Sequence, residues 1–598
     1  MVPDNGGNWK KFARLKRPSV KSVRRRARKI ESATLRHGHR FIISRWQNLR
    51  DVRRHAFGWV ILASLLVVAA GLQLYWVQSK YSQAAPVPGG TYAEGVIGRL
   101  DTINPIYAST QSERSAVKLI FSGLLRYDDR NNLVGDIADE WTVSDDGKTY
   151  TLRLRDDIRW HDGEELTADD VVYTLNLIKN PQTRSPLYRT WQDIKVERIS
   201  DNAVTFTLPS PYSPFLHALT FGVMPEHVLK DVAPNRLRES SFNRSPVGTG
   251  PFVFRTIQVI DPAVDRVVLQ LDRNDNYHDG RAKLERFQIH TYRNSAALRQ
   301  GFLTREINAA NDLTRRDATT ILEQQPTSIV DDAPIMNGVY AFLNNDSPVF
   351  SDIKVRQALL YATDRRDLRQ QIGYGAPLSG PLLTSNFSGD AGDVQASFDE
   401  ERAKQLLDES GWKIEQGTVR QKDGVKLELR LIVPEDGEFP RVAQQLSKQW
   451  RAIGVDARIQ RVEVAAFEQN VIKARDYDVL IYELAIGADP DVFAYWHSSQ
   501  ASALGFNLSN YKSGVVDDAL VSARARSEDD LRDTKYRAFV KRWVADVPAI
   551  ALYQPRLKYV TNDQTRAISP NETIVDSVDR YHSILNWTVR IGERYKTP

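Results

Sequence analysis

The chain of 598 residues contains no cysteine at all. This absence excludes disulfide bonds, thiolate nucleophiles, cysteine-ligated zinc and iron–sulfur clusters. It also excludes a membrane anchor built on a lipidated cysteine.

The sequence also lacks the local motifs of several large enzyme classes. It has no Gly-x-Ser-x-Gly, no His-Glu-x-x-His, no Gly-x-x-x-x-Gly-Lys and no Gly-x-Gly-x-x-Gly that follows a strand-like run. Its ten histidines are scattered, and no two of them are four residues apart, although a metal site could still assemble in space. We therefore expect no enzyme, with no catalytic residues, no cofactor and no resident metal.

Positive charge is concentrated at the N-terminus. Residues 1–56 hold 17 lysines and arginines against 3 acidic residues, a net charge of +14. The whole chain carries +6, so with Lys80 set aside the part from Tyr81 onward carries −9. The body of the protein is therefore acidic, and the basic arm of residues 1–55 is suited to the anionic inner face of a membrane. Nucleic-acid binding is the alternative for such an arm, but no interleaved aromatic residues support it.

A stretch of 24 residues without any charge, Ala56 to Ser79, follows this arm. It is long enough to cross a bilayer core of about 30 Å. Trp59, Tyr75 and Trp76 lie near its ends, where aromatic belts form. The positive-inside rule predicts a single transmembrane helix at 56–79, with the N-terminus cytoplasmic and the large domain outside. A buried core helix and a cleaved signal peptide are the alternatives.

Residues 80–90 contain two prolines and end in two glycines, which predicts a short extended linker. Beyond it, short β-rich runs alternate with amphipathic stretches, which indicates an α/β architecture. Strands are predicted at 150–154, 203–208, 266–271, 426–433 and 477–482. Helices are predicted at 167–179, 354–363, 400–410, 439–453 and 529–546.

Three local motifs carry structural expectations. The segment Asp145-Asp-Gly-Lys148 predicts a hairpin turn in which Gly147 takes a positive φ. Trp160 is expected to pack beneath the polar turn that follows it. Gly248 and Gly250, on either side of Thr249, predict a tight reversal with dihedral angles that suit glycine.

Several segments together resemble one family. Residues 133–155 and 159–173, with the runs Asp-Glu-Trp-Thr-Val-Ser-Asp-Asp-Gly-Lys-Thr-Tyr and Arg-Trp-His-Asp-Gly, are similar to the signature of the oligopeptide/dipeptide/nickel-type solute-binding proteins of ABC importers. Further matching motifs follow in the family's order, namely residues 100–105, 120–125, 245–252, 271–277, 350–365, 403–411 and 546–553. The resemblance covers about residues 90–560.

The resemblance implies a two-lobed periplasmic-binding-protein-like fold of the large, three-domain type. Lobe one would be discontinuous, built from residues 91–120, 240–334 and 551–598. An inserted domain would occupy 121–239, and lobe two would run over 335–550. The implied function is the capture of a peptide-like ligand by hinge closure and its delivery to the permease and ATPase subunits of an ABC transporter. We expect a monomer that binds no nucleic acid.

The resemblance also suggests ligand-binding residues. In relatives that take peptides, an Asp after a strand of the last large domain binds the α-amino group of the ligand, and Asp489 matches that position best. The alternative is that Asp489 only caps the turn at Pro490. Gly487 lies where the ligand backbone would approach. Ser109, Thr110 and Gln111 belong to a loop that resembles one whose backbone faces the ligand.

Three other interpretations stay open from sequence. They are a nickel or metal-chelate binder of the same fold, a peptide sensor or chaperone without a permease, and an extracytoplasmic hydrolase, which the missing motifs disfavour.

Overall fold

The computed structural model describes residues 49–373, 375–387, 394–415, 417–435, 437–568 and 573–595. The chain divides into two compact units, residues 1–85 with 593–598, and residues 86–592. Residues 1–48 of the basic arm predicted at 1–55 lie outside the described residues.

The first unit contains one long helix. Helix α2 (Leu49–Tyr81) includes an apolar segment, Ala56–Val77, that has no buried residue and is long enough to cross a membrane. The helix begins before the predicted limit at residue 56 because Leu and Arg, which precede the apolar run, are good helix formers. Strand β1 (Ser82–Val87) follows at once and pairs with β22 (Arg590–Tyr595), so most of the predicted linker at 80–90 is a strand.

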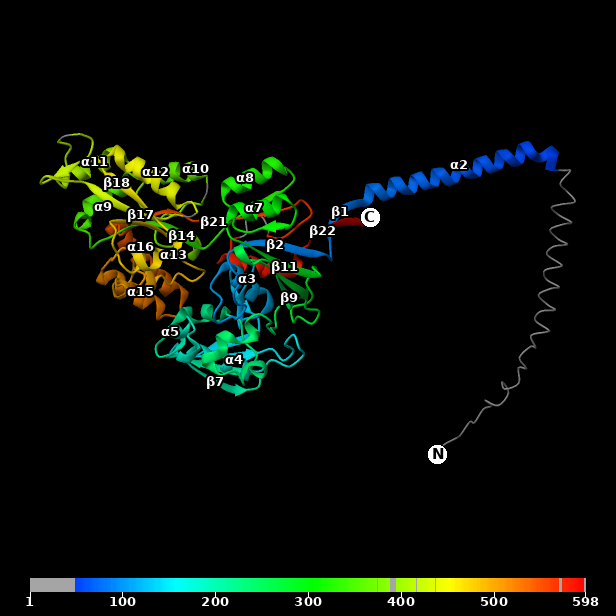
Figure 1. The fold of residues 1–598 in the computed structure, drawn as a ribbon, viewed down its shortest axis with the longest axis horizontal. Helices are drawn as coiled ribbons and strands as arrows, with labels where there is room; N and C mark the ends of the chain where they lie inside the picture. The colour runs from blue at the N-terminus through cyan, green and yellow to red at the C-terminus, as the bar shows by residue number, and fades with distance from the viewer. Residues whose placement is uncertain are drawn as a thin grey trace, which may run out of the picture. The chain divides into compact units, whose positions relative to one another are not determined.

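The second unit contains three main sheets (Figure 1). The first has seven strands in the order β13 (Ile329–Pro334), β21 (Arg556–Thr561), β12 (Ala309–Ala310), β2 (Thr91–Ile97), β11 (Arg286–Tyr292), β10 (Arg266–Arg273) and β9 (Phe252–Asp261). The second has five strands in the order β18 (Asp456–Val462), β17 (Glu428–Pro434), β19 (Val479–Ala485), β14 (Asn337–Leu343) and β20 (Ala549–Tyr553). The third is antiparallel, in the order β5 (Ala138–Val143), β6 (Thr149–Leu154), β8 (Ala203–Thr207) and β7 (Lys195–Ser200). We call the parts built on the seven-stranded and five-stranded sheets lobe one and lobe two, and the part built on the third sheet the inserted part.

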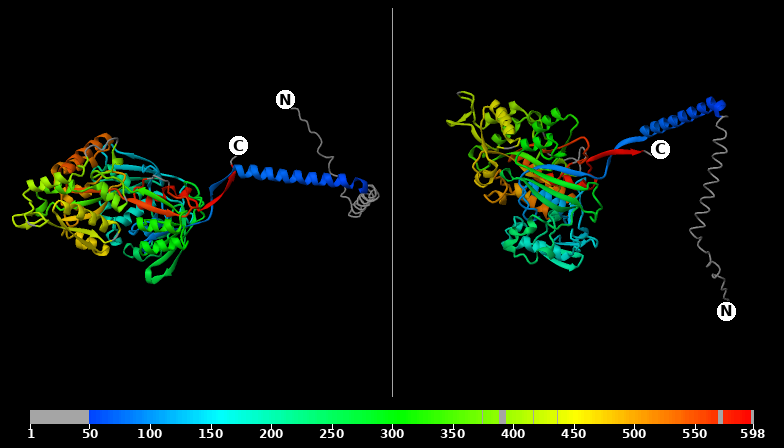
Figure 2. Two further views of the ribbon diagram at one scale, coloured as in Figure 1. Left: turned by 90° about the horizontal axis from the view of Figure 1, so that it is seen from above. Right: turned by 45° about the vertical axis from the view of Figure 1, so that its right-hand side comes forward.

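Helices cover the sheets of both lobes (Figures 1 and 2). The remaining short strand pairs are β3 (Leu125–Tyr127) with β4 (Leu133–Gly135), and β15 (Gln421–Lys422) with β16 (Val425–Lys426). The helices are α3 (Gln111–Ile120), α4 (Ala168–Lys179), α5 (Tyr188–Trp191), α6 (Glu226–Leu229), α7 (Ser295–Leu303), α8 (Arg315–Gln324), α9 (Ile353–Tyr361), α10 (Arg365–Ile372), α11 (Glu400–Glu409), α12 (Phe439–Ala452), α13 (Val464–Phe467), α14 (Phe493–Trp496), α15 (Gly514–Arg524) and α16 (Asp529–Asp546).

The alternation of side chains along β14 explains the core of lobe two. Val339, Ala341 and Leu343 pack into one apolar cluster, whereas Tyr340 and Phe342 pack into another on the opposite face. A strand buried on both faces reads as a continuous apolar run, as in residues 339–343 of β14 and 479–482 of β19. The mixed α/β class and the predicted helices and strands are confirmed.

Two chain segments connect the lobes side by side. Ile335 and Met336 join β13 to β14, and Gln554 and Pro555 join β20 back to β21. The Ile335 N–H donates to the Pro555 carbonyl at 3.0 Å, and the Gln554 amide donates to the Ile335 carbonyl at 2.9 Å. The predicted limit of lobe two at residue 550 falls inside β20, which ends at Tyr553.

Two of the three local motifs behave as expected. Gly147 has φ +68°, and Trp160 is buried. The expectation for Gly248 and Gly250 is wrong, since neither is among the described glycines with positive φ. A Cβ atom on Gly248 would lie 2.0 Å from the carbonyl oxygen of Ile120, so close backbone packing against α3 requires glycine there.

Candidate functional site

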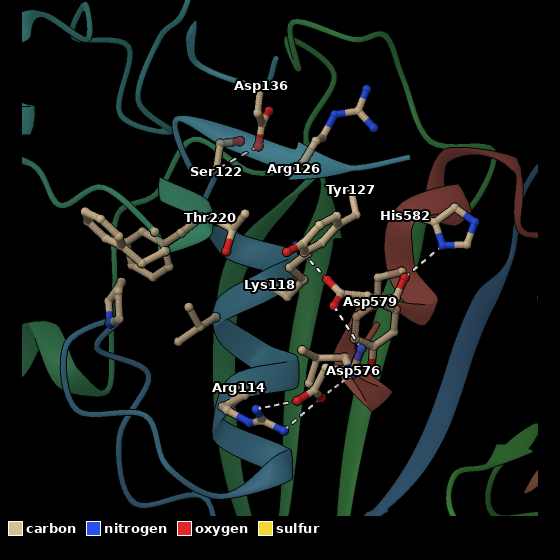
Figure 3. Close-up of a pocket in the computed structure, with 18 of the residues that line it drawn as sticks. Arg114, Lys118, Ser122, Arg126, Tyr127, Asp136, Thr220, Asp576, Asp579 and His582 are labelled. Carbon is tan, nitrogen blue, oxygen red and sulfur yellow. Dashed lines mark hydrogen bonds and ion pairs between the residues drawn. The ribbon is translucent and has the colours of Figure 1, made fainter. Parts of the chain in front are cut away.

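A cavity of about 470 Å³ lies in lobe one beside the inserted part. Its walls come from α3, from the 3₁₀ helix η3 (Ser213–Thr220), from the loop around Asp279 and from the 3₁₀ helix η11 (Ser577–Asn586). These segments are far apart in the sequence, so only the fold brings them together. Figure 3 shows the side chains of α3 and η11 that face one another across it.

Helix α3 supplies the cations of the cavity. Arg114 and Lys118 are one helical turn apart, so they project from the same face, while Ala116, Leu119 and Ile120 are buried in the core of lobe one. The helix begins with a capping box, in which the Thr110 hydroxyl accepts from the Glu113 N–H at 3.2 Å. The capping box thereby fixes the first turn of the helix from which the two cations project.

A buried ion pair positions the acids of the cavity. Arg580 of η11 donates to both carboxylate oxygens of Glu94 on β2, at 3.0 and 2.8 Å, and both side chains are completely buried. Tyr559 also donates to Glu94, at 2.6 Å. This network holds η11 against the sheet and directs Asp576 and Asp579 toward α3.

Cations and acids meet as two ion pairs across the cavity (Figure 3). Arg114 donates to both oxygens of Asp576 at 2.9 Å, and Lys118 lies 3.2 Å from Asp579. Burial opposes ionisation of Asp576, but Arg114 holds the pKa of that carboxyl below its usual range. The side chains of Arg114 and Asp576 are 40% and 37% exposed, so a ligand can reach both charges.

A polar chain leads from this cavity to lobe two. The hydroxyl of Tyr127 lies 2.9 Å from Nδ1 of His217, and Nε2 of His217 lies 3.8 Å from Asp489. Burial lowers the pKa of His217. The negative charge of Asp489 partly offsets this lowering, and the positive charge of Arg532 adds to it. A second contact joins the same parts, since Arg524 of lobe two lies over the ring of Tyr212, 4.9 Å from its centroid. The inserted part and lobe two are therefore in contact in this structure.

Asp489 itself is already paired. Its carboxylate accepts from Arg532 of α16 at 2.7 and 2.9 Å, and from the N–H of Asp491 at 3.0 Å. Both members of the pair are almost buried, with side chains 10% and 12% exposed. Asp489 also lines a second, smaller cavity of about 270 Å³, which shares His217 with the first. It thus caps its turn and faces a cavity at the same time.

The other residues suggested from sequence have local partners. Gly487 has φ +82°, and its N–H donates to the Met336 carbonyl at 2.9 Å, beside the connection between the lobes. The N–H groups of Ser109 and Thr110 donate to Glu113 at 2.9 and 3.0 Å. Gln111 is the first residue of α3. The structure places Gly487 and Asp489 together, and it places Ser109, Thr110 and Gln111 at the start of the helix that carries Arg114.

Glu483 of β19 is a partly buried residue whose carboxyl has no cation within 4 Å among the described residues. The side-chain amide of Asn337 donates to it at 2.5 Å. Burial raises the pKa of Glu483 to about 7, and the negative charges of Asp312 and Asp576 in lobe one add to this. An ammonium group placed between these carboxyls would relieve that repulsion.

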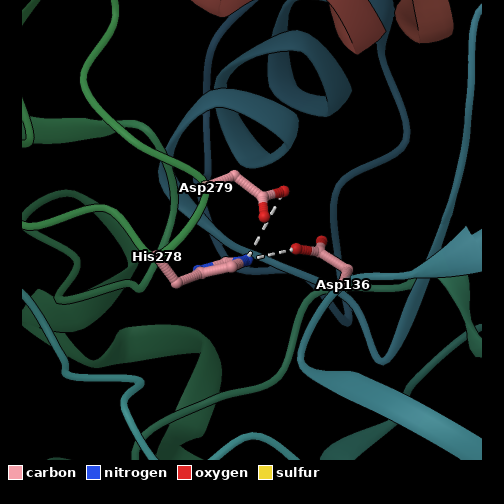
Figure 4. A group of neighbouring side chains, drawn as sticks. All are labelled: Asp136, His278 and Asp279. Carbon is pink, nitrogen blue, oxygen red and sulfur yellow. Dashed lines mark hydrogen bonds and ion pairs between the residues drawn. The ribbon is translucent and has the colours of Figure 1, made fainter.

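One group of side chains has the composition of a metal site (Figure 4). Nε2 of His278 lies 2.9 Å from Asp136 and 3.9 Å from Asp279. However, Arg126 donates to Asp279 at 2.9 Å, and the Gly123 N–H donates to Asp136 at 3.2 Å. Both acids thus already accept from protein donors, one of them a guanidinium, so this group fits a buried hydrogen-bond network better than a metal site.

Sequence reasoning missed most of the cavity. Arg114 and Lys118 could have been found from their spacing on an amphipathic helix. No local signal connects them with Asp576 and Asp579, or Asp489 with Arg532 and His217.

Two lobes joined by two adjacent chain segments, with cavities beside the contact between them, define a binding protein of the periplasmic type. The family model of bacterial extracellular solute-binding proteins, family 5 (Middle), matches residues 132–505, and the chain belongs to this family.

Relatives and solved structures agree with this assignment. The oligopeptide-binding protein AppA of Bacillus subtilis is 28% identical over 507 residues, which covers 83% of this chain and 92% of AppA. The putative ABC transporter peptide-binding protein of Brucella ovis is 27% identical, with coverage of 78% and 87%. The crystal structure of NikZ from Campylobacter jejuni in complex with Ni(L-His) has a TM-score of 0.69 at 28% identity, with coverage of 83% and 99%. These matches confirm the sequence-based recognition and the α/β two-lobed fold, and they support binding of peptides or other solutes as the general function.

Proposed function

We propose that this protein is a membrane-anchored, extracytoplasmic binding protein that captures peptide-like ligands by hinge closure and delivers them to an ABC transporter. The observation that carries the proposal is the pair of half-exposed, opposite charges, Arg114 and Asp576, in a cavity beside the contact between the lobes. A zwitterionic ligand can replace this pair by matching each charge with one of its own.

A free peptide could replace the contact between Arg114 and Asp576, because it carries both an α-ammonium and an α-carboxylate. Arg114 and Lys118 would take the carboxylate, since guanidinium groups bind carboxylates in bidentate fashion. Asp576 would take the ammonium from the lobe-one side, with Glu483 facing it from lobe two. Asp489 is the sequence-based candidate for the same role, although a ligand ammonium would have to compete there with Arg532.

Closure would occur about the two connecting segments near Ile335 and Gln554. Short paired connections between two sheets are the usual site of hinge motion in two-lobed proteins. A ligand that touches both lobes stabilises the closed state by its differential affinity for that state. Gly487 lies at this hinge through its hydrogen bond to Met336, so its positive φ would help the adjacent loop to turn toward the ligand.

The apolar segment of α2 and the basic arm support anchoring of the protein in the cytoplasmic membrane. We propose that the N-terminus is cytoplasmic and that the large unit is exposed outside the membrane as a monomer, where it meets the permease of its transporter. Protease added to intact spheroplasts should remove the large unit and leave a small N-terminal fragment. Full-length protein in the soluble fraction, or a mature product that begins near Ala85, contradicts anchoring.

The ligand proposal is tested with the full chain in detergent. Native mass spectrometry should show co-purified peptides, and calorimetry should show tight binding of free peptides and much weaker binding of N-acetylated ones. Purified protein that binds neither kind of peptide contradicts the proposal.

Two variants decide which carboxyl of lobe two binds the ammonium. If Asp489 does so, Asp489→Asn should lower the affinity about 30- to 5000-fold, the usual effect of removing one partner of a buried charge pair. If Glu483 does so, the loss should appear in Glu483→Gln. Equal binding of free and acetylated peptides by the wild type removes both residues from an ammonium site.

A nickel chelate is the second candidate. His217 and His582 line the main cavity, and NikZ, whose structure holds Ni(L-His), is among the similar proteins. Elemental analysis of protein incubated with nickel and histidine separates the two ligands, because a peptide binder retains no nickel after gel filtration.

A further inference from the structure

A third cavity, of about 430 Å³, lies against the chain segments that connect the lobes, away from the cavity of about 470 Å³ described above. It is open to solvent and is lined by Asp332 of β13, Arg556 of β21, the α10 residues Arg366, Arg369 and Gln370, and Gly373 and Gly375 just beyond that helix. It shares no lining residue with either of the other two cavities. It is therefore a separate feature of the molecule.

Both lobes contribute to its walls. Helix α10 belongs to lobe two, whereas β13 and β21 belong to the sheet of lobe one. Arg315, at the start of α8 of lobe one, reaches the same place, because a Cβ atom on Gly373 would lie 1.0 Å from its guanidinium. Four arginines thus converge where the two lobes meet.

The balance of charge at this cavity is strongly positive. Among the described residues, no carboxylate lies within 4 Å of the guanidinium groups of Arg315, Arg366 or Arg369, and no hydrogen bond involves them. The one acid of the lining, Asp332, is 3.0 Å from Arg556 and 3.6 Å from Lys558 and is shared between them.

The nearest further acids are also engaged. The carboxylate of Asp364 caps the start of α10, where it accepts from the N–H groups of Arg366 and Asp367 at 3.0 and 2.9 Å. Glu438, near Lys558, lies 3.5 Å from Arg441. Burial and the neighbouring Arg366 lower the pKa of Arg369, while Asp364 only partly offsets them. Within the part of the chain that the structure describes, Arg315, Arg366 and Arg369 are therefore the guanidinium groups of this site without a carboxylate within 4 Å.

The lining leaves room for a ligand. Gly373 has φ +63° and ends α10, and Gly375 has φ +95° and lies against the ring of Tyr553. A Cβ atom on Gly373 would overlap the guanidinium of Arg315, and one on Gly375 would lie 2.6 Å from the Tyr553 ring, so both glycines allow these side chains to pack closely. The space for a ligand is the open cavity of about 430 Å³ itself. Planar guanidinium groups bind tetrahedral oxyanions through paired N–H donors, and two or three of them make a strong site for such anions.

We propose that this cavity, which we call the hinge arginine site (Arg315, Arg366, Arg369 and Arg556), binds a phosphate-type oxyanion between the two lobes. The anion is either free phosphate or the phosphate headgroup of an anionic lipid, and both offer the same chemistry to the arginines. Because the site takes residues from both lobes, its occupancy is linked to their relative position, and the bound anion stabilises the arrangement seen here.

The test uses the full chain in detergent and inorganic phosphate as the probe. Calorimetric titration should show one saturable site, and the double variant Arg366→Gln/Arg369→Gln should weaken it at least tenfold. The matched control is Arg236→Gln/Arg281→Gln, which removes two arginines whose side chains are 74% and 64% exposed elsewhere on the surface. The control should bind phosphate like the wild type.

Nanodiscs separate the two sources of the anion. Hydrogen exchange of α10 should slow when phosphate is added if free phosphate is the ligand. It should slow in nanodiscs with phosphatidylglycerol, but not in those of phosphatidylcholine alone, if a lipid headgroup is the ligand. The double variant should lose either effect. Absence of both effects in the wild type, or equal phosphate binding by the double variant and the control, overturns the proposal.

Discussion

Each lobe has an arginine–aspartate ion pair at a cavity, but the pair of lobe one is partly exposed and the pair of lobe two is almost buried. In lobe one, Arg114 and Asp576 are 40% and 37% exposed and come from segments 462 residues apart. In lobe two, Arg532 and Asp489 are 12% and 10% exposed and only 43 residues apart.

Burial decides what each pair can do. An exposed ion pair contributes about 0–1 kcal/mol to stability, so exchanging it for a ligand's charges costs the fold little. A buried pair contributes little net stability when intact, but removing one partner is expensive because the other charge is left in a poorly solvated place. The lobe-one pair is therefore suited to binding, and the lobe-two pair is suited to holding the loop at Gly487 and Asp489 against α16.

The strongest test of this difference removes one arginine from each pair. Arg532→Met should lower the free energy of unfolding by about 3–5 kcal/mol, because Asp489 would remain buried without its cation. The matched variant Arg114→Met should lower it by less than about 1 kcal/mol. Chemical denaturation followed by circular dichroism measures both. Equal losses in the two variants would contradict the division into a structural and a binding pair.

Glu483 sharpens the comparison because it is partly buried and no cation among the described residues lies within 4 Å of its carboxyl. The folded pKa of about 7 lies above the ordinary value, so the folded state binds more protons between pH 4.5 and 7 and stability falls as pH rises through this range. Glu483→Gln should remove this loss and raise the stability at pH 8 by about 2–3 kcal/mol relative to the wild type. Denaturation at pH 5 and pH 8 gives the difference, and an identical pH slope in both proteins contradicts it.

Exchanging the two charges of the lobe-one pair tests its role in binding. The double variant Arg114→Asp/Asp576→Arg keeps an ion pair but reverses its direction. Its stability should fall by about 0.5–2 kcal/mol, because the Asp576 carboxylate also caps η11 by accepting from the Val578 N–H. It should bind free peptides at least about 30-fold more weakly, about 2 kcal/mol. Calorimetry measures the affinity. Unchanged affinity in the reversed pair would show that the ligand charges do not meet these residues.

The smallest effect concerns His217, between the two regions. It faces Tyr127, Asp489 and Arg532, and burial lowers its pKa below the usual 6.5. As pH falls below 6.5 the unfolded chain takes up a proton that the folded protein resists, so stability is lost on acidification, by less than about 2 kcal/mol at pH 5. His217→Gln should show a shallower decline between pH 7 and pH 5 in the same denaturation experiment.

The sequence was most informative where the relevant physics is local. The ends of α4, α11 and α16 could be predicted within a residue or so because capping residues and apolar periodicity act within one or two turns. The apolar segment of α2 was recognisable because length and missing charge suffice. The family followed from motifs of adjacent residues.

Predictions that depended on distant neighbours were less complete. Gly248 was correctly singled out, but for the wrong reason, since the requirement comes from the backbone of Ile120 and not from its own dihedral angles. Asp489 was singled out from its position after a strand, yet Arg532 and His217, which determine its electrostatic environment, could not be connected with it. The predicted lobe limits remain a proposal, with β20 extending past residue 550.

The amino-acid sequence by itself determined five of the helices and five of the strands, the apolar span and the family, because each depends on residues close together in the chain. Only the tertiary structure decided which charges meet. Arg114 finds Asp576, Asp489 finds Arg532, and four arginines of two lobes gather at the hinge, because these contacts depend on how sheets and helices from distant parts of the chain pack together. The energetic role of each charge follows from its burial, which no local pattern of residues encodes.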